Sequence, residues 1–134
     1  MAPKPPKPNL SISISANHHR SILWWLAFFR SNKMAHFMLE ITYTVPLEQI
    51  ETKLAEHRAF LQTGYDQGWL LCSGPQNPRI GGIVIARAPS LEALQTLFAN
   101  DPYQIANFAD YRFVEFNPVK FQPWLEDWVN GSVE

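Results

Sequence analysis

The sequence of 134 residues has little of several features that would define a class of protein. Its only cysteine, Cys72, excludes an internal disulfide and fits a reducing compartment, so we expect a cytoplasmic protein. Its main apolar run, residues 22–29, has eight residues. A helix needs about 20 to cross a bilayer, so we expect no membrane span. No internal repeat is visible.

Acidic residues are missing from residues 1–37, which contain five lysines and arginines. All twelve acidic residues therefore lie in residues 38–134, together with only six basic ones. Nucleic-acid binding requires clustered Lys and Arg side chains that neutralise phosphates. The acidic part of the chain thus argues against a nucleic-acid partner.

The same boundary separates a leader, residues 1–37, from a predicted folded domain, residues 38–134. Proline and serine dominate residues 1–20, and this composition predicts disorder. Three interpretations of the leader stay open. It is an extension upstream of a natural start at Met34 or Met38, a targeting segment, or a helix that binds a surface through its apolar run.

Beyond residue 38 the apolar residues follow the periods of strands and helices. Alternation over residues 39–45 predicts a strand, and apolar residues at 47, 50, 54 and 61 predict a helix over 47–65. Further strands are expected at 69–73, 80–88 and 109–116, with a helix after an N-cap at Ser90. This βαββαβ order is typical of a ferredoxin-like α+β fold with a four-stranded antiparallel sheet. Apolar residues at 121, 124, 125 and 128 predict a C-terminal helix.

The strands at 69–73 and 83–86 are apolar on both sides, which indicates that both faces of the sheet are covered. The two long helices would cover only one of these faces. Large apolar patches are rare on monomers. We therefore expect a homodimer formed sheet to sheet, with the tryptophan-rich C-terminal helix closing part of the interface.

His57 is the only histidine of the predicted domain. It takes the position at which another leucine would continue the apolar side of the 47–65 helix. A buried imidazole needs partners for its ring nitrogens. His57 is therefore either a structural histidine bonded to the backbone or the acid/base group of a site.

Asp101 is the candidate partner of His57. The order Asn100-Asp101-Pro102 is also typical of a helix N-cap followed by proline in the first turn. The two roles are compatible because a carboxylate has two oxygens. A carboxylate bonded to one imidazole nitrogen fixes the tautomer and leaves the other nitrogen to move a proton.

Other residues are weaker candidates. Cys72 lies in an apolar strand without a neighbouring base, which favours an inert core thiol over a nucleophile. Gly81-Gly82 precedes a strand and lacks the Lys-Ser/Thr of a phosphate loop, so these glycines favour a close backbone approach. Arg58 and Asp66 are expected in solvent. The remaining histidines fall in the leader without nearby acids, so no metal site is expected: His18, His19 and His36.

Six short motifs occur in the order and with the spacing of the YciI-like (YCII-related) proteins. They are His57-x-x-Phe60-Leu61, Gly68-Trp69-Leu70-Leu71, Gly74-Pro75, Gly82-Ile83-Val84-Ile85-Ala86, Ser90-Leu91-Glu92-Ala93 and Asp101-Pro102-Tyr103. The chain resembles this family over about residues 38–121. The resemblance implies a dimeric α+β barrel of ferredoxin-like subunits and a His–Asp pair in a pocket, which corresponds to His57 and Asp101 here.

The resemblance also implies a small-molecule substrate, and some relatives eliminate chloride from chlorinated aromatic breakdown products. We expect Gly74, Pro75 and Tyr103, which lie in matching motifs, to bind the substrate, and we expect no cofactor and no metal. The chain departs from the family at Leu54, where an arginine commonly precedes the histidine by three residues. Lys53 is the nearest replacement for that charge, although it lies on a different side of the helix.

Two main hypotheses about function stay open at this point, beside a third in which the chain is an oligomerisation domain with a degenerate site, which the missing arginine would fit. In the first, His57 is a general acid or base oriented by Asp101 in a lyase-like or hydrolase-like enzyme. In the second, the pair is structural and the domain is a non-catalytic module that binds a small ligand or a partner. An open cavity against the His57 ring favours the first hypothesis, and a ring sealed by packed side chains favours the second.

Overall fold

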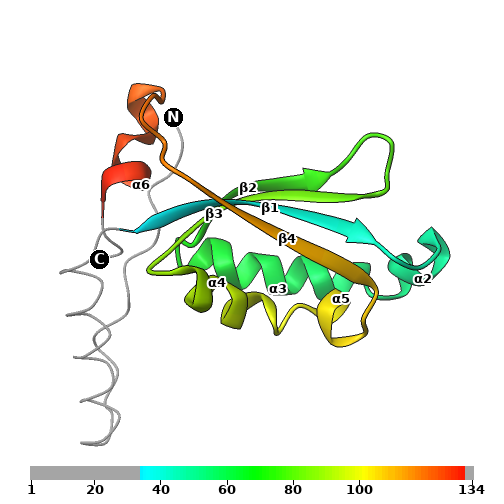
Figure 1. The fold of residues 1–134 in the computed structure, drawn as a ribbon. Helices are drawn as coiled ribbons and strands as arrows, with labels where there is room; N and C mark the ends of the chain where they lie inside the picture. The colour runs from blue at the N-terminus through cyan, green and yellow to red at the C-terminus, as the bar shows by residue number, and fades with distance from the viewer. Residues whose placement is uncertain (1–33, 132–134) are drawn as a thin grey trace, which may run out of the picture.

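Four strands pair into one antiparallel sheet in the order β2-β3-β1-β4 (Figure 1). The structure is a computed structural model and describes residues 34–131. Its elements, in chain order, are β1 (Ala35–Tyr43), α2 (Leu47–Thr52), α3 (Leu54–Asp66), β2 (Leu70–Pro75), β3 (Gly81–Ala88), α4 (Leu91–Phe98), α5 (Pro102–Ile105), β4 (Ala109–Phe116), a 3-10 turn (Pro123–Leu125) and α6 (Glu126–Asn130). The order and the pairing confirm the predicted ferredoxin-like α+β fold.

The core lies between one face of the sheet and the helices α3, α4 and α5, which all lie on that side (Figure 1). Alternate residues of β1 point into this layer, and Phe37, Leu39 and Ile41 are buried. Leu94 and Phe98 of α4 meet them from the helix side, because residues four apart share one face of a helix. This layer fixes α3 and α5 against the sheet.

Strand β1 begins at Ala35, three residues before the predicted domain boundary. His36 lies in this strand and is buried, so its assignment to the leader is wrong. The alternating pattern does extend back to Phe37, whose side chain is fully buried. The predictions for residues 1–33, which include the apolar run, lie outside the described residues.

The predicted helix over residues 47–65 is two helices that meet at Lys53. Lys53 has φ −115° and ψ 4°, values outside the helical range, and its N–H donates to the carbonyls of Ile50 and Glu51. The Thr52 hydroxyl donates to Gln49 O at 2.6 Å, so side-chain bonding satisfies part of the end of α2. The continuous apolar spacing hid this break, since no glycine or proline marks it.

Among the described elements, α3, α4 and α5 leave the opposite face of the sheet without a helix layer along much of its length (Figure 1). Met38 pairs with Ile85 and with Val114 in neighbouring strands, so these three half-buried side chains share this face. Cys72, which pairs with Ile85, is exposed on β2, so its prediction as a core thiol is wrong. The apolar run over residues 69–73 predicts a strand that is covered on both sides. In the structure, β2 is an edge strand with a bulge between Leu70 and Cys72.

Gly81 is a site of close backbone approach, as predicted. A Cβ atom built on it would lie 1.7 Å from the carbonyl oxygen of Ile41 in β1. Only glycine fits there without moving β3 away from β1. This contact positions the β2–β3 hairpin over the end of β1.

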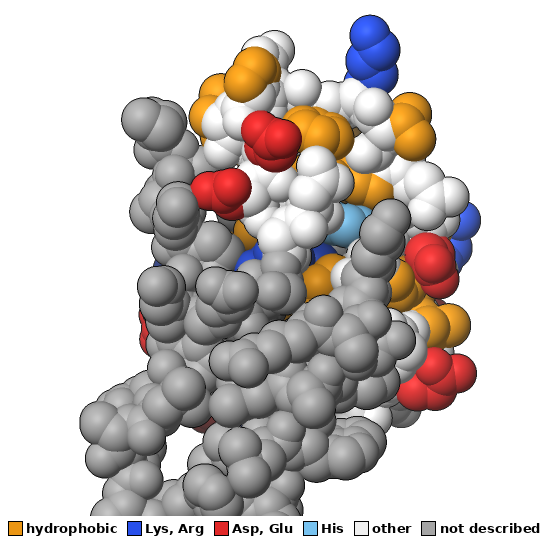
Figure 2. Space-filling view, turned by 90° about the vertical axis from the view of Figure 1, so that its left-hand side faces the viewer, with side chains coloured by type: hydrophobic (Ala, Val, Ile, Leu, Met, Phe, Trp, Pro, Cys, Tyr) orange, Lys and Arg blue, Asp and Glu red, His pale blue; other side chains and the backbone are white. Residues whose placement is uncertain are grey.

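The C-terminal segment is shorter than the predicted amphipathic helix. Trp128 of α6 is buried, whereas Trp124 is 51% exposed. Beneath Trp128 lies Arg87, which donates through Nε to Gly68 O at 2.8 Å and through Nη1 to Trp128 O at 2.9 Å. Its guanidinium carbon lies 5.3 Å from the Trp128 ring centroid. Figure 2 views this end of the molecule, where hydrophobic and acidic side chains share the surface.

None of the helices within residues 34–131 is long and apolar enough to cross a membrane.

Candidate active site

His57 lies one turn into α3, on the side that faces the sheet. Its backbone N–H donates to Lys53 O at 2.9 Å, which sets the first turn of this helix. The imidazole is 12% exposed, so it is neither sealed in the core nor free in solvent. The helix position at which another leucine would continue the apolar series therefore lies at the border of the core.

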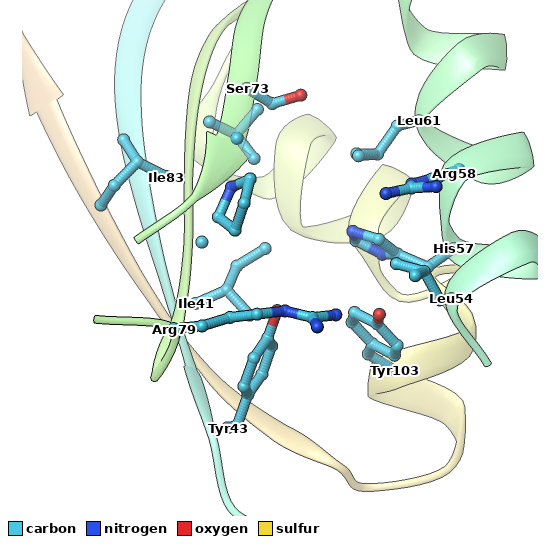
Figure 3. Close-up of a pocket in the computed structure, with 14 residues that line it drawn as sticks. Ile41, Tyr43, Leu54, His57, Arg58, Leu61, Ser73, Arg79, Ile83 and Tyr103 are labelled. Atoms are coloured by element: carbon cyan, nitrogen blue, oxygen red, sulfur yellow. The ribbon is translucent and has the colours of Figure 1, made fainter. Parts of the chain in front are cut away.

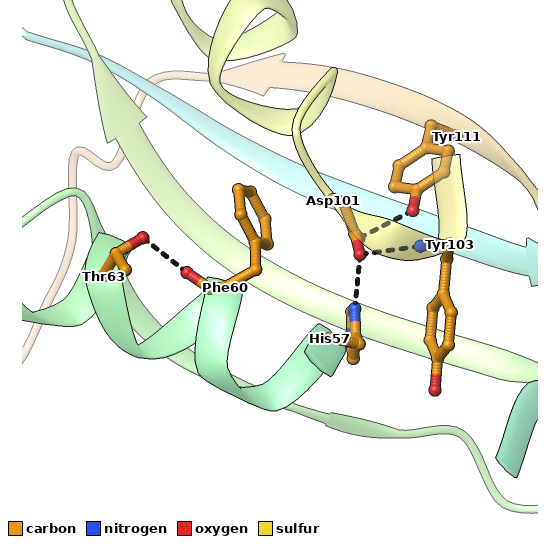
Figure 4. A network of polar contacts seen from close by, with 6 residues as sticks. All are labelled: His57, Phe60, Thr63, Asp101, Tyr103 and Tyr111. Carbon is orange, nitrogen blue, oxygen red and sulfur yellow. Dashed lines mark hydrogen bonds and ion pairs between the residues drawn. The ribbon is translucent and has the colours of Figure 1, made fainter. Parts of the chain in front are cut away.

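Asp101 is the N-cap of α5, and its carboxylate is fully buried. Oδ1 accepts from His57 Nδ1 at 2.8 Å and from Tyr103 N at 3.1 Å, and Oδ2 accepts from the Tyr111 hydroxyl at 2.7 Å (Figure 4). An ionised carboxylate only accepts hydrogen bonds, so Nδ1 carries the proton in this arrangement. His57 Nε2 is then the nitrogen that can exchange a proton with a ligand.

Tyr103 packs its ring on the imidazole of His57, with the centroids 4.0 Å apart and the planes 14° from parallel. Its hydroxyl is buried and has no hydrogen-bond partner among the described residues. Burial, with the nearby Tyr43 and Asp101, raises the pKa of Tyr103 to about 12. The phenol therefore stays protonated at physiological pH and keeps a proton to donate.

Tyr111 of β4 holds the carboxylate from the far side. Burial and the Asp101 carboxylate raise the pKa of Tyr111 far above its ordinary value. The phenol stays protonated, as its hydrogen bond to Oδ2 requires. The sequence analysis missed this residue. Its one signal was the apolar alternation of the strand, which places Tyr111 on the helix side.

A cavity of about 520 Å3 lies between α3 and the ends of β1, β2 and β3, and the His57 ring borders it (Figure 3). This volume falls in the range of small-molecule sites. Tyr103 also borders it, as do Gly74 and Pro75 of β2. The complete lining is Ile41, Tyr43, Leu54, His57, Arg58, Leu61, Ser73, Gly74, Pro75, Arg79, Gly82, Ile83, Val84 and Tyr103.

The structure thus brings together the five residues predicted for the site, which are His57, Asp101, Gly74, Pro75 and Tyr103. Four of them line the cavity, and Asp101 lies behind His57. Their roles in binding and catalysis stay predictions.

Two arginines at the cavity were not predicted. Arg58 was expected only in solvent, but it lines the cavity as well as being exposed. Arg79, in the hairpin between β2 and β3, extends across the cavity in Figure 3. Lys53 lies outside the lining and pairs with Glu56 at 3.6 Å, so it does not place a charge there. No periodicity marks Arg79, because it lies in a loop.

Within the described part of the chain, no three His, Cys, Asp or Glu side chains gather in a way that could hold a metal ion. The polar side chains at the cavity are the His57 imidazole, the phenols of Tyr43 and Tyr103, the Ser73 hydroxyl and the guanidinium groups of Arg58 and Arg79.

Together, these features define a ferredoxin-like α+β domain with a histidine–carboxylate pair at the edge of an open cavity. The chain belongs to the YCII-related family, because the profile of the YCII-related domain matches residues 34–117. This match starts at Met34 and so includes the whole of β1.

One similar solved structure is 5-chloro-2-hydroxyhydroquinone dehydrochlorinase (TftG) from Burkholderia phenoliruptrix AC1100, in complex with 2,5-dihydroxybenzoquinone. The sequence identity is 16% and the TM-score is 0.49, and the match covers 65% of this chain and 93% of that chain. The comparison with curated proteins finds no match.

Proposed function

We propose that the chain is an enzyme that acts on a small molecule, with His57 as its general acid or base and Asp101 as the group that orients it. The main support for this proposal is the hydrogen bond of 2.8 Å from His57 Nδ1 to the buried Asp101 carboxylate, together with the position of the His57 ring at the cavity. This arrangement leaves Nε2 for proton transfer with a ligand. A positioned acid/base of this kind contributes about 10²–10⁴ in rate.

Two classes of reaction can use a single acid/base group of this kind. In a lyase-like elimination, Nε2 takes a proton from the substrate. The electron pair of the broken C–H bond forms the new double bond, and chloride leaves with the electron pair of the C–Cl bond. In a hydrolase-like reaction, Nε2 takes a proton from the attacking water and returns it to the leaving group. The family resemblance favours elimination from a chlorinated ring.

A non-catalytic ligand-binding module is the second candidate, and one observation favours it. Asp101 also caps α5 and accepts a hydrogen bond from Tyr111, so the carboxylate has a structural role that is independent of any reaction. In that case the histidine only connects α3 to α5. Removing it would lower stability and change no activity.

The proposal includes a homodimer formed through the sheet face opposite α3, α4 and α5. Met38, Ile85 and Val114 lie on that face, and Phe116 at the end of β4 is 39% exposed. A second copy would cover this apolar surface.

The test compares wild type with His57→Ala and His57→Gln in a screen of small lactones and halogenated phenols. We expect turnover of at least one substrate by wild type and a loss of about 10²–10⁴ in kcat/KM for both variants, with the fold retained. Circular dichroism and the thermal midpoint provide the check on folding. Equal turnover by the variants, or no turnover with a destabilised His57→Ala protein, would support the structural reading instead.

A further inference from the structure

We propose that the cavity takes a small planar molecule that carries a carboxylate, and that Arg79 on the β2–β3 hairpin binds this carboxylate while His57 faces the ring. This inference rests on the proposed function for the role of His57, but the binding of the anion is separate from it and is tested separately.

The charge distribution is the first observation. Described residues carry six lysines and arginines, and two of them, Arg58 and Arg79, line this one cavity. None of the fourteen lining residues is acidic, although acidic residues outnumber basic ones in this part of the chain. A cleft lined by charge of one sign concentrates ligands of the opposite sign.

The second observation is the position of Arg79. In Figure 3 its side chain extends from the hairpin across the cavity, with the guanidinium end toward Tyr103 and His57. A guanidinium has five N–H donors in a planar fork that matches the two oxygens of a carboxylate. A ligand carboxylate at Arg79 would place the rest of the molecule beside the imidazole.

Arg79 already has two partners: the Tyr43 side chain, which lines the same cavity, and Glu51 at the protein surface. Arg79 Nη1 lies 3.2 Å from Glu51 Oε1, and the Glu51 side chain is 60% exposed. Exposed ion pairs contribute little to stability, so a ligand carboxylate in the cavity can compete with Glu51. The pair also keeps the arginine near the cavity mouth before a ligand binds.

The lining of the cavity favours a ring with polar substituents. Its walls combine polar side chains with apolar ones, which include Ile41, Leu54, Leu61 and Val84. Tyr103 lines the cavity and is 1% exposed, and its hydroxyl has no partner among the described residues, so the phenol is a donor without an acceptor beside the cavity. A flat apolar ring with an anionic group at one end and an oxygen substituent fits this set.

The test uses benzoate and benzamide, which have the same ring and differ in charge, in NMR titrations of the full chain. We expect wild type to bind benzoate about tenfold or more tightly than benzamide, because a charge-assisted bidentate pair is stronger than a neutral one. Arg79→Gln should lose that preference and leave benzamide binding unchanged. Arg79→Lys, which keeps the charge and loses the fork, should give an intermediate value.

Arg112→Gln is the matched control, because Arg112 is an exposed arginine paired with Glu40 at 3.4 Å and lies outside the cavity lining. It should bind both probes as wild type does. Equal wild-type affinities for benzoate and benzamide, unchanged benzoate binding by Arg79→Gln, or no saturable benzoate binding would each overturn the inference. Inorganic phosphate that displaces benzoate with equal affinity would overturn the planar class.

His57→Gln separates this inference from the proposed function. It should keep the preference for benzoate and lose turnover of any substrate found in the screen. If it keeps turnover while Arg79→Gln loses benzoate binding, the acid/base role fails and the anion site stands. If Arg79→Gln binds benzoate normally while His57→Gln is inactive, the anion site fails and the acid/base role stands.

Discussion

At the scale of single residues, the buried carboxylate of Asp101 connects three parts of the chain. It accepts from His57 in α3, from the backbone of Tyr103 in α5 and from Tyr111 in β4. A buried carboxylate without donors is costly, so the three donors stabilise it together. The residue that orients the imidazole therefore also holds the helix layer to the sheet.

Tyr111→Phe tests this joint role. Removing the hydroxyl leaves Oδ2 of a buried carboxylate without this donor, so we expect a loss of about 1.5–3 kcal/mol in the free energy of unfolding. Urea denaturation measures it. Tyr65→Phe is the control, because the Tyr65 hydroxyl bonds Ser73 Oγ at 2.6 Å in an exposed setting and should matter less. Equal losses in the two variants would contradict the account of Asp101.

At the scale of elements, α6 attaches to the sheet through buried polar groups. Arg87 is 1% exposed, and within residues 34–131 its hydrogen bonds go to backbone carbonyls, including those of Gly68 and Trp128. Burial lowers the pKa of Arg87 to about 10, so it stays charged at neutral pH. His36 lies beside it, with its ring centroid 5.4 Å from that of Trp128.

The attachment of α6 should weaken in acid. Burial lowers the pKa of His36 below 6.5, and the Arg87 charge lowers it further, against hydrogen bonds from the imidazole to the backbone of Trp128 and Val129 that raise it. The unfolded chain therefore binds a proton first as pH falls. Stability from neutral His36 is fully present above pH 6.5 and is lost as pH falls toward the lowered pKa of the folded state.

His36→Gln removes this titration. We expect the free energy of unfolding to fall less between about pH 7.5 and about pH 5 in the variant than in wild type. Urea unfolding at both pH values measures the difference, which is independent of any constant effect of the substitution. An identical fall in both proteins would show that His36 titrates normally.

Much of this fold could be predicted because its signals are local. The alternation in β1 and the N-caps at Ser90 and Asp101 are written in neighbouring residues, and the structure has them. The break at Lys53 could not be predicted, because the apolar spacing runs through it. Cys72 was misplaced because a short apolar run does not reveal that its strand lies at the edge of the sheet.

The residues of the candidate site also fall into two groups, those that the local sequence indicates and those that only the tertiary structure brings to the site. His57 stood out as a polar residue in an apolar series, and Asp101 as a cap, so both were accessible from the sequence. Arg79 reaches the cavity only through the course of the hairpin, and Tyr111 reaches Asp101 only through strand order. Such long-range contacts leave no periodic trace in the sequence.

At the scale of the whole molecule, the sheet face opposite α3, α4 and α5 is the basis for the prediction of a dimer. Wild type should have twice the chain mass of 15.4 kDa in size-exclusion chromatography with light scattering. Ile85→Asp places a charge among Met38 and Cys72 on that face and should yield monomers with the far-ultraviolet spectrum retained. Gln95→Glu, on exposed α4, is the control and should stay dimeric. A monomeric wild type would contradict the prediction.

The β2–β3 hairpin has a consequence for how proteins of this kind diverge. Residues 77–80 are mostly exposed and contribute little to the packed interior. Asp101, in contrast, is fully buried and accepts hydrogen bonds from three parts of the chain. Selection can therefore exchange the hairpin tip freely while the proposed acid/base pair stays constant. Paralogues that share the dyad but differ at this tip should prefer different compounds and yet melt at similar temperatures.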